Sequence, residues 1–466
     1  MKPSIPQGTR DFSAATLRKR NFILRTIQSV FEKYGFEPLE TPALENTETL
    51  MGKYGEEGDK LIFKILNNGL NNPDKKETIV RDFESVMAGK TTKGITERAL
   101  RYDLTIPFAR YVAMNHGQLT LPFKRYQMQP VWRADRPQRG RYREFWQCDA
   151  DIAGSNSLLH ETELVLIYTH AFQQLGIPVN IHINNRKILS GLAALCGGED
   201  MMMDITIAID KLDKIGIEKV QDELVSKGLS IEQVESVASF IAINGSNEDI
   251  LQQLNELFQT IPAGLEGVAE LRDVIDLFNA AKPKTSDIPE LKIDLSLARG
   301  LNYYTGSIFE VKSSTVRMGS IGGGGRYDDL TGLFGVKGVG GVGISFGVDR
   351  IYDVMEELNI FPESLQQGTD VLLFNTGTDE LKQVLLLAES LRAAGTSAEI
   401  FHEPVKFDKQ FKYAERKKIA FVVILGSKEI QNGTVVVKHL SSGKQLELSQ
   451  SDLQNDWKSL FNEQKP

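Results

Sequence analysis

The chain of 466 residues is too long for one hydrophobic core and indicates roughly three domains of about 150 residues each. Its apolar fraction of 41% and charged fraction of 25% are ordinary for a soluble globular protein, and no apolar run approaches the ~20 residues that a bilayer span needs. The net charge of −8 argues mildly against a nonspecific nucleic-acid coat, although local basic patches still bind phosphate in such proteins.

The N-terminus and the cysteines favour a cytoplasmic protein. The opening residues, MKPSIPQGTRDF, contain no hydrophobic core of a signal peptide, so nothing in them directs export. Cys148 and Cys196 lie far apart in the sequence and have no metal-ligand spacing. We therefore expect reduced structural cysteines, no metal cage made by the protein and no contact with a membrane.

The N-terminal part predicts a helix followed by short strands. Apolar residues recur at helical spacing over residues 16–34, and Gly35 ends this helix. Residues 36–41 alternate as a strand. Residues 59–66 and 77–82 are expected to pair as a hairpin across a polar turn, which implies antiparallel pairing.

Residues 99–115 are predicted to pass from a strand into a helix. Pro107 falls near the first turn of this helix, where no backbone donor is needed. Asp103 and Thr105 would then lie at the end of the strand, which brings a carboxylate and a hydroxyl to one junction.

The segment from Lys124 to Asp151 is the most cationic part of the chain, with seven cations in its first twenty residues and only Asp135 to oppose them. Its flanks alternate polar and apolar residues, whereas Pro137 and Gly140 break any helix between them. We interpret the segment as two strands joined by a long basic loop, with a composition suited to phosphate. On charge alone a solvated hairpin is the better interpretation, so a phosphate-binding role for this segment needs support from the rest of the chain.

A helix over residues 160–175 and a strand over 179–184 are predicted next. Residues 193–289 then carry helix formers, many acids and few aromatics, with no apparent phosphate-binding chemistry. We interpret this region as a helical insertion, a separable module between two halves of one core, residues 1–192 and 290–366.

Three glycine-bearing stretches follow one another: RGLNYYTGSIFEV (299–311), SIGGGGRYDD (320–329) and GVGGVGISFGVDRIY (338–352). We expect the first to contain a strand, the second to be a four-glycine turn, and the third to be a strand that runs into a helix carrying Arg350. Glycine lets backbone approach a ligand closely, although a lone glycine-rich loop is more often a structural turn. The spacing matches neither a Rossmann nor a Walker loop. Strands in hairpins with helical inserts predict an α+β fold, with a mostly antiparallel sheet flanked by helices.

Residues 367–466 are predicted to form an independent α/β domain with a partly parallel sheet and a closing hairpin. Six cations cluster on or near the helix expected at 407–417, against Asp408 and Glu415. Such a run is usually a solvated helix face. This domain is near neutral while the remainder carries the acidic excess, and that asymmetry slightly favours a polyanion partner.

Several of these stretches match known signatures. YGFEPLETPALE (34–45), the basic segment and GVGISFGVDRI (341–351) correspond in order to motifs 1, 2 and 3 of class II aminoacyl-tRNA synthetases. LARGLNYYTGSIFE (297–310) and GGGGRYDDL (322–330) are more discriminating, and through them the chain resembles the histidyl-tRNA synthetase family over essentially its full length. Asn302 stands where that family commonly has aspartate, which leaves the adjacent hydrogen bonding open.

The resemblance implies an ATP site. When a histidine carboxylate attacks the α-phosphorus of ATP, negative charge grows on the α-phosphate oxygens, so fixed cations are needed and a side-chain nucleophile is not. The catalytic cations implied at the α-phosphate are Arg133 and Arg299. Arg141 and Arg350 match positions at the outer phosphates and adenine, and Phe145 is expected to stack on the adenine opposite Arg350. Mg²⁺ is expected on the β and γ phosphates.

The resemblance also implies an L-histidine site. One group of residues matches the family's positions that bind the α-ammonium of histidine, and a second group matches the positions that face its ring. Tyr303 belongs to the same site. The ammonium group comprises Asp103, Thr105 and Gln147, and the ring group comprises Asp151, Tyr304 and Tyr327. Hydrogen bonds to both ring nitrogens would select strongly, because a different side chain would leave buried polar groups unpaired. No segment resembles an editing domain.

The C-terminal domain resembles the anticodon-binding domain of several class II synthetases, with residues 413–438 carrying most of the match. This implies tRNA(His) as a partner, and motif 1 implies a homodimer with Pro42 near its two-fold axis. The bases read, the role of the insertion and the order of substrate binding are not implied.

Other classes stay in view. A non-catalytic, histidine-sensing subunit of a phosphoribosyltransferase would share the core, but it typically lacks the anticodon domain and erodes the arginine signatures. A class II synthetase for proline, threonine or glycine would share the three motifs but not LARGLNYYTG. A pure RNA-binding module would leave the phosphate-binding arginines without a role.

Overall fold

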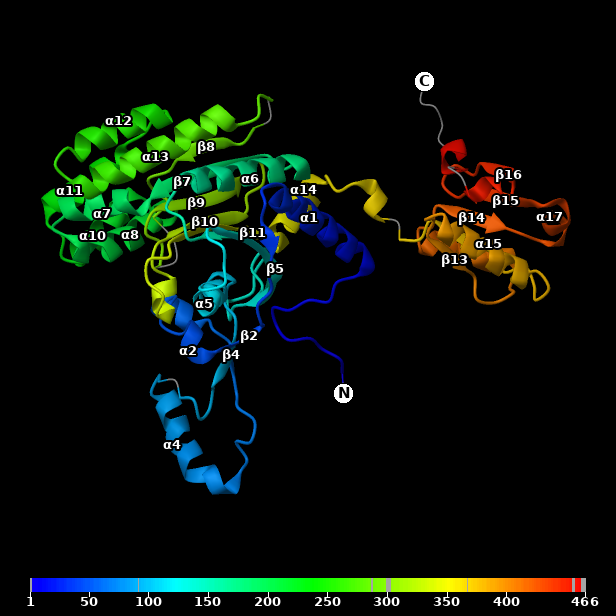
Figure 1. Cartoon of the computed structure of the whole chain (residues 1–466), viewed down its shortest axis with the longest axis horizontal. Helices are drawn as coiled ribbons and strands as arrows, with labels where there is room; N and C mark the ends of the chain where they lie inside the picture. Colours follow the sequence, from blue (N-terminus) through cyan, green and yellow to red (C-terminus); the bar gives the residue numbers. More distant parts are fainter. Residues whose placement is uncertain are drawn as a thin grey trace. The chain divides into compact units, whose positions relative to one another are not determined.

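The computed structural model describes residues 2–90, 92–285, 288–298, 303–366, 368–454 and 457–461. Its contacts divide the chain into two compact units, and each unit contains a sheet of its own (Figure 1). The first unit comprises Met1–Asp11 and Arg20–Ile360, and the second comprises Phe12–Lys19 and Phe361–Pro466.

An eight-stranded sheet organises the first unit, in the order β1-β5-β6-β11-β10-β9-β7-β8. The five inner pairings are antiparallel, and the two outer pairings, β1 with β5 and β7 with β8, are parallel. The strands are β1 (Glu37–Pro38), β5 (Phe123–Trp132), β6 (Glu144–Ala153), β7 (Val179–Asn185), β8 (Glu290–Ile293), β9 (Ser307–Ser313), β10 (Gly322–Tyr327) and β11 (Gly341–Gly347). The predicted α+β class with a mostly antiparallel sheet is confirmed, as are the two strands on either side of the basic loop.

Helices cover this sheet where their apolar stripes predict. The largest are α1 (Ala14–Lys33), α5 (Thr105–Asn115), α6 (Leu159–Leu175) and α14 (Val348–Leu358), in agreement with the sequence periodicity. Helix α6 packs against β11 and α14 packs against β6 and β11. From α6, the Tyr168 hydroxyl donates to the carbonyls of Gly323 and Ser345, both at 3.0 Å. Phe31 stacks on Tyr126 with ring centroids 5.7 Å apart, which fixes α1 against β5.

The four glycines of SIGGGGRYDD do not form the predicted turn, because they lie in strand β10 between β9 and β11. A Cβ at Gly324 would come within 2.1 Å of the Gly343 carbonyl oxygen, and one at Gly322 would come within 2.7 Å of the Tyr168 ring. The glycines are therefore needed for close approach by the neighbouring strand and helix. The prediction failed because a strand without side chains shows no alternation.

The hairpin predicted from residues 59–66 and 77–82 is also wrong. Residues 77–82 lie in helix α4 (Lys76–Met87), and the strand of the first half pairs elsewhere. A side-chain oxygen of Asn72 accepts from the Asp74 amide and starts the turn that leads into α4, so the helical period prevails over a short apolar alternation. The small antiparallel sheet here has the order β2-β4-β3, beside helices α2 and α3. Their bounds are β2 (Leu44–Asn46), β3 (Lys64–Ile65), β4 (Arg98–Leu100), α2 (Thr47–Leu50) and α3 (Gly55–Lys60).

Helices fill the chain between β7 and β8, as the sequence predicts (Figure 1). They are α7 (Arg186–Leu195), α8 (Met202–Asp210), α9 (Leu212–Ile215), α10 (Ile217–Ser226), α11 (Ile231–Ala242), α12 (Asn247–Leu257) and α13 (Pro262–Ala281). Helix α13 packs against α6 and α7, and the region belongs to the first compact unit. A separate module bounded at 193 and 289 stays a prediction.

The second unit is built on a five-stranded sheet in the order β13-β12-β14-β15-β16. Strand β12 is parallel to β13 and β14, and the closing hairpin is antiparallel, so the predicted partly parallel sheet is confirmed. Its elements are β12 (Val371–Leu373), α15 (Leu381–Ala393), β13 (Ala398–Ile400), α16 (Phe407–Arg416), β14 (Phe421–Ile424), α17 (Ser427–Asn432), β15 (Thr434–His439) and β16 (Gln445–Ser449). Across the described part of the chain, no helix is long and apolar enough to cross a membrane.

Candidate active site

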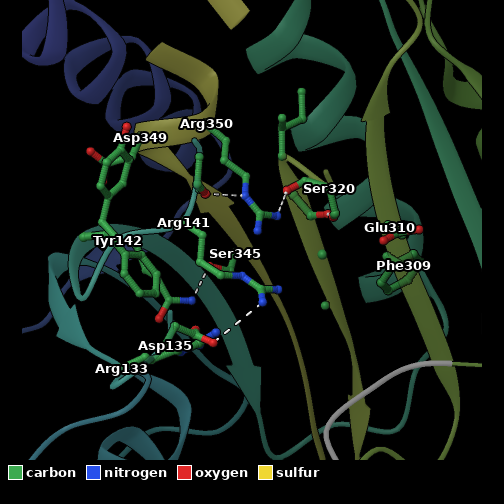
Figure 2. A pocket seen from close by; sticks show the side chains of 18 of the residues that line it. Arg133, Asp135, Arg141, Tyr142, Phe309, Glu310, Ser320, Ser345, Asp349 and Arg350 are labelled. Atoms are coloured by element: carbon green, nitrogen blue, oxygen red, sulfur yellow. Dashed lines mark hydrogen bonds and ion pairs between the residues drawn. The ribbon is translucent and has the colours of Figure 1, made fainter. Parts of the chain in front are cut away.

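A cavity of about 410 Å³ opens over the middle of the large sheet, on β6, β10 and β11 (Figure 2). The basic loop between β5 and β6 and the start of α14 form one end of it. Its lining includes Arg133, Arg141, Phe145, Gln147, Tyr304 and Arg350, which are six of the residues that the family resemblance implies. The solvated-hairpin interpretation of the basic segment is therefore wrong, because its cations share a cavity with motif 3.

Arg133 is held by aromatic groups and a backbone carbonyl. Its Nε donates to the Tyr102 carbonyl at 3.1 Å, and its guanidinium carbon lies 4.3 Å from the centre of the Tyr102 ring and 5.2 Å from that of Phe145. Among the described residues no carboxylate lies within ion-pair distance of Arg133. Its positive charge is thus fixed in position and left for a ligand.

Arg350 and Arg141 complete the cationic end. The Nε of Arg350 donates to the Gly140 carbonyl at 2.8 Å and its Nη1 donates to the Ser320 carbonyl at 2.5 Å (Figure 2). Burial, reinforced by the charges of Arg141 and Arg133, lowers the pKa of Arg350 below its ordinary value. Arg141 is 44% exposed and pairs with Asp135 only at 3.7 Å. An anion would relieve the mutual repulsion of these three arginines.

Asp349 fixes the start of α14 beside this end. Its carboxylate pairs with Arg10 and, at 2.5 Å, with Arg20, and it accepts the Trp146 amide at 3.1 Å. The motif 3 helix is thereby tied to α1 and to β6, which positions the neighbouring Arg350.

Asp103 lies buried at the junction of β4 and α5, two residues before the helix begins. It accepts the Tyr54 hydroxyl at 3.0 Å, the Ile106 amide at 3.1 Å and the Tyr303 hydroxyl at 3.4 Å. Burial raises the pKa of Asp103, although these hydrogen bonds and Arg133 oppose the rise. Thr105, the first residue of α5, also hydrogen-bonds to Tyr303. The predicted ammonium-binding pair is therefore brought together with one of the predicted tyrosines.

Asp151 and Tyr327 meet deeper in the site. The Tyr327 hydroxyl donates to Asp151 Oδ1 at 2.7 Å, and Arg125 Nη2 pairs with Asp151 Oδ2 at 2.8 Å. Arg125 is fully buried and lies over the Phe108 ring at 4.4 Å. Burial, opposed by Arg125 and Tyr327, raises the pKa of Asp151. Tyr304 joins the group, with burial and these carboxylates raising its pKa.

Gln147 lines the cavity as well. Its Nε2 donates to the Ser345 hydroxyl at 2.9 Å, and its Oε1 has no hydrogen-bond partner among the described residues. Arg299 and Asn302 lie outside the described residues, so the second cation implied at the α-phosphate stays a prediction.

Sequence reasoning missed several groups that hold this site together: Tyr54, Arg125, Asp149, Glu161 and Ser345. Arg326 illustrates the reason, because it lies in a recognised signature but pairs with Glu161 of α6 at 2.5 Å, with both side chains buried. This pair fixes the strand that presents Tyr327. Such partners lie far apart in the chain, and only alternation along β6 could have indicated Asp149.

The geometry defines a class of protein. An antiparallel sheet carries a cavity lined by uncompensated arginines, and buried carboxylates and tyrosines gather around Tyr304 of the same lining, which is the arrangement of a class II aminoacyl-tRNA synthetase.

Comparison with known proteins narrows the class. The sequence model of histidyl-tRNA synthetase matches residues 92–351, and that of the anticodon-binding domain matches residues 370–458. A histidine–tRNA ligase from Phocaeicola vulgatus is 50% identical over 446 residues, which cover 95% of this chain and 96% of that protein. One from Christiangramia forsetii is 49% identical over 451 residues, covering 96% and 97%. The chain belongs to the histidyl-tRNA synthetase family.

Solved structures agree with this assignment. The crystal structure of histidyl-tRNA synthetase from Nostoc sp. superposes with a TM-score of 0.81 at 33% identity, covering 99% of this chain and 100% of that one. A structure from Bacillus halodurans, described as an ATP phosphoribosyltransferase regulatory subunit/histidyl-tRNA synthetase, has a TM-score of 0.72 at 19% identity, covers 91% of this chain and 100% of that one, and shares the fold.

Proposed function

We propose that this chain is a histidine-tRNA ligase, which activates L-histidine with ATP to histidyl-adenylate and pyrophosphate and then transfers histidine to the 3′ end of tRNA(His). One observation carries the proposal. Arg133 and Arg350, which lack carboxylate partners among the described residues, line the same cavity as Gln147 and Tyr304, and the buried carboxylates of Asp103 and Asp151 lie close enough to Tyr304 to raise its pKa. Such a cavity suits a polyphosphate at one end and a dibasic amino acid at the other.

In the activation step an oxygen of the histidine carboxylate attacks the α-phosphorus, and the bond to the pyrophosphate oxygen breaks. Arg133 supports the charge that develops on the α-phosphate, because it is fixed by Tyr102 and has no competing carboxylate. Arg299 is proposed for the opposite side of the same phosphate. Arg141 and Arg350 are proposed for the outer phosphates and adenine, with Phe145 against the base.

The amino acid is proposed to bind at the buried end. Asp103 is the acceptor for the α-ammonium, with support from Thr105 and Gln147. The ring is faced by Asp151 and by the tyrosines of the same cluster, which are Tyr303, Tyr304 and Tyr327. Asp103, Asp151 and Tyr327 are buried and Tyr303 and Tyr304 are partly buried, so an amino acid that leaves them unpaired is rejected.

Mg²⁺ is proposed to accompany ATP. In the described part of the chain no three metal-ligating side chains gather in one place, and each carboxylate that lines the cavity has a cation beside it. Asp135 pairs with Arg141, Glu310 with Lys312, and Asp349 with Arg10 and Arg20. This suits an ion that takes most of its oxygens from phosphate and water, and bound there it would neutralise the leaving pyrophosphate.

The remaining partners are proposed from the second unit and from motif 1. The cations of α16, including Lys409, Lys412 and Arg416, suit tRNA phosphates in an anticodon-binding domain. The groove beside Pro38 and Leu39 suits a two-fold homodimer, and light scattering should then give twice the chain mass of 52.0 kDa. A cytoplasmic enzyme of translation is the corresponding location.

The test measures exchange of labelled pyrophosphate into ATP with each of the twenty amino acids, followed by charging of tRNA(His). Exchange is expected with L-histidine alone. A folded preparation that shows no histidine-dependent exchange would refute the proposal, and exchange with proline, threonine or glycine instead would assign a different synthetase. Exchange without charging would restrict the proposal to its first step.

A further inference from the structure

Strand β6 carries a third polar side chain on the face that lines the pocket. Side chains alternate along a strand, so Gln147, Asp149 and Asp151 point to the same face. Gln147 lines the cavity and Asp151 is proposed to face the substrate ring, and Asp149 lies between them. The strand register places Asp149 beside Ser345 of β11 and Gln127 of β5.

The Asp149 carboxylate is buried and only partly satisfied. It is 2% exposed, it accepts a hydrogen bond from the Ser345 hydroxyl, and its Oδ1 has no partner among the described residues. Asp151 Oδ2 also has no hydrogen bond of good geometry, but Asp151 differs in having a cation, because Arg125 forms an ion pair with this oxygen and Tyr327 donates to the other. A buried carboxylate oxygen without a partner is costly, so Asp149 Oδ1 is available to a ligand donor.

Charge in this part of the site is not balanced by the protein. The groups that interact with Asp149 come from several surrounding elements: Arg125 of β5, Cys148 and Asp151 of β6, Ser345 of β11, Arg101 after β4, Asp103 before α5, Tyr168 of α6 and Tyr304. Burial raises the pKa of Asp149 to about 7, against the opposing charge of Arg125 and with the help of Asp151.

Three carboxylates, Asp103, Asp149 and Asp151, are buried here, and the one cation among the described residues in an ion pair with this group is Arg125, because the buried guanidinium of Arg101 also acts on Asp149 but is shared with Glu40 and Glu45. Arg133 also lies near Asp103, but its charge is matched by the phosphates and carboxylate of the two substrates. The α-ammonium of an amino acid balances one of the two remaining carboxylates, through Asp103. The other requires a second positive charge or a proton from the ligand side.

We propose that Asp149 is a second ring-binding carboxylate, so that L-histidine is bound with a hydrogen on both ring nitrogens, one directed to Asp151 and the other to Asp149. This inference rests on the proposed function, because it assumes that the substrate is histidine. No covalent bond changes in the binding step. One proton is taken from solvent above neutral pH, where both the free ring and Asp149 are largely deprotonated, and it is held between Asp149 Oδ1 and the ring.

The second carboxylate would add selectivity of a kind that shape alone does not supply. Asparagine and glutamine offer polar side chains of similar reach, but neither accepts a proton near neutral pH. Bound here, they would supply neither a proton nor a positive charge, so Asp149 would either stay charged and buried without a cation or take a proton from solvent itself, and both outcomes weaken binding relative to histidine.

The experiment is calorimetric titration of the full-length chain with L-histidine at pH 8 in buffers of different ionisation enthalpy, which counts protons taken up. Uptake of about one proton is expected for the parent chain and near zero for Asp149→Asn. In pyrophosphate exchange, the KM for histidine of Asp149→Asn should rise about ten- to a hundredfold, as expected for loss of one charge-assisted hydrogen bond, with the KM for ATP unchanged. Asp353→Asn is the control, because burial also raises the pKa of Asp353 outside the cavity, and parent values are expected.

Each outcome decides the matter. Histidine binding by the parent chain without proton uptake overturns the proposal, as does an Asp149→Asn enzyme with the parent KM and proton count. If Asp149→Asn does not fold, L-1,2,4-triazol-3-ylalanine replaces it as the probe, since its ring is far less basic than imidazole. At least tenfold weaker binding of this analogue to the parent chain supports the proposal, and equal binding overturns it. Absence of any binding heat with histidine would instead show that the proposed function fails, and this inference with it.

Discussion

At the end of the cavity proposed for ATP, which we call the ATP end, the charged groups are arginines that face open space, whereas the groups proposed for histidine, which we call the histidine end, are carboxylates almost completely removed from water. Arg141 is 44% exposed, and Arg133 is held through its Nε and by ring contacts, which leaves its charge uncompensated. Asp103 and Asp151 are each 2% exposed and are surrounded by hydroxyls, an amide and Arg125.

The difference follows from the cost of desolvation. A partly exposed guanidinium keeps water until phosphate replaces it, so it needs no protein partner. A buried carboxylate has no contact with water, so it must be paired with a cation or hydrogen-bond donors within the folded protein. Substitutions at the ATP end should therefore reduce the reaction rate with little loss of stability, and substitutions at the histidine end should reduce both.

The largest effect is expected from Arg125→Met, which removes the buried cation that is paired with Asp151. Asp151 would be left buried and unpaired, so the free energy of unfolding should fall by about 3–5 kcal/mol in urea denaturation. Arg139→Met is the matched control, because it breaks an arginine ion pair with Glu357 that is exposed, and its loss of stability should be much smaller. Equal losses in the two variants would show that burial does not distinguish these pairs.

For Arg133→Ala we expect a large loss of reaction rate and little loss of stability. The rate of pyrophosphate exchange at saturating substrates should fall roughly a hundred- to a thousandfold, which is the usual loss when one fixed electrostatic stabiliser is removed. Stability should change by less than about 1 kcal/mol, because no carboxylate loses its partner. Arg136→Ala, in the same loop, is the control and should keep the parent rate. If the kcat of Arg133→Ala stays within about threefold of the parent value, Arg133 has no part in the mechanism. Arg299→Ala is expected to lose rate on the same scale as Arg133→Ala.

The sequence predicted the elements whose periodicity is long and unambiguous. The helix α6 and the pair of strands around the basic loop appear where the apolar spacing puts them. The failures lie where side-chain patterns are short or missing. Strand β10 has almost no side chains to alternate, and the apolar residues Ile79 and Val80 fit a strand until the turn before α4 is seen.

The sequence likewise predicts only part of the candidate site. Residues within signatures, such as Arg133 and Arg350, were assigned by resemblance and do line the cavity. The residues that hold Asp103 and Asp151 were not, because Tyr54 reaches Asp103 only when the chain between them folds back, and Arg125 faces Asp151 only in the particular register in which β5 pairs with β6. Asp149 was within reach of the sequence, since its spacing from Gln147 and Asp151 is that of one strand face.

The smallest effect is expected from Arg141→Ala. This variant tests whether the arginines of the ATP end act on different phosphates, with different effects on KM and kcat. Arg141 is the most exposed of the three arginines, and its pairing with Asp135 at 3.7 Å holds it loosely. A cation on the outer phosphates aids binding of ATP before and during the reaction alike, so its loss should raise the KM for ATP about three- to tenfold and leave kcat nearly unchanged. A cation on the α-phosphate acts mainly where charge develops, so its loss should appear in kcat. If Arg141→Ala lowers kcat as far as Arg133→Ala does, the two arginines act on the same phosphate and the grading along the cavity is wrong.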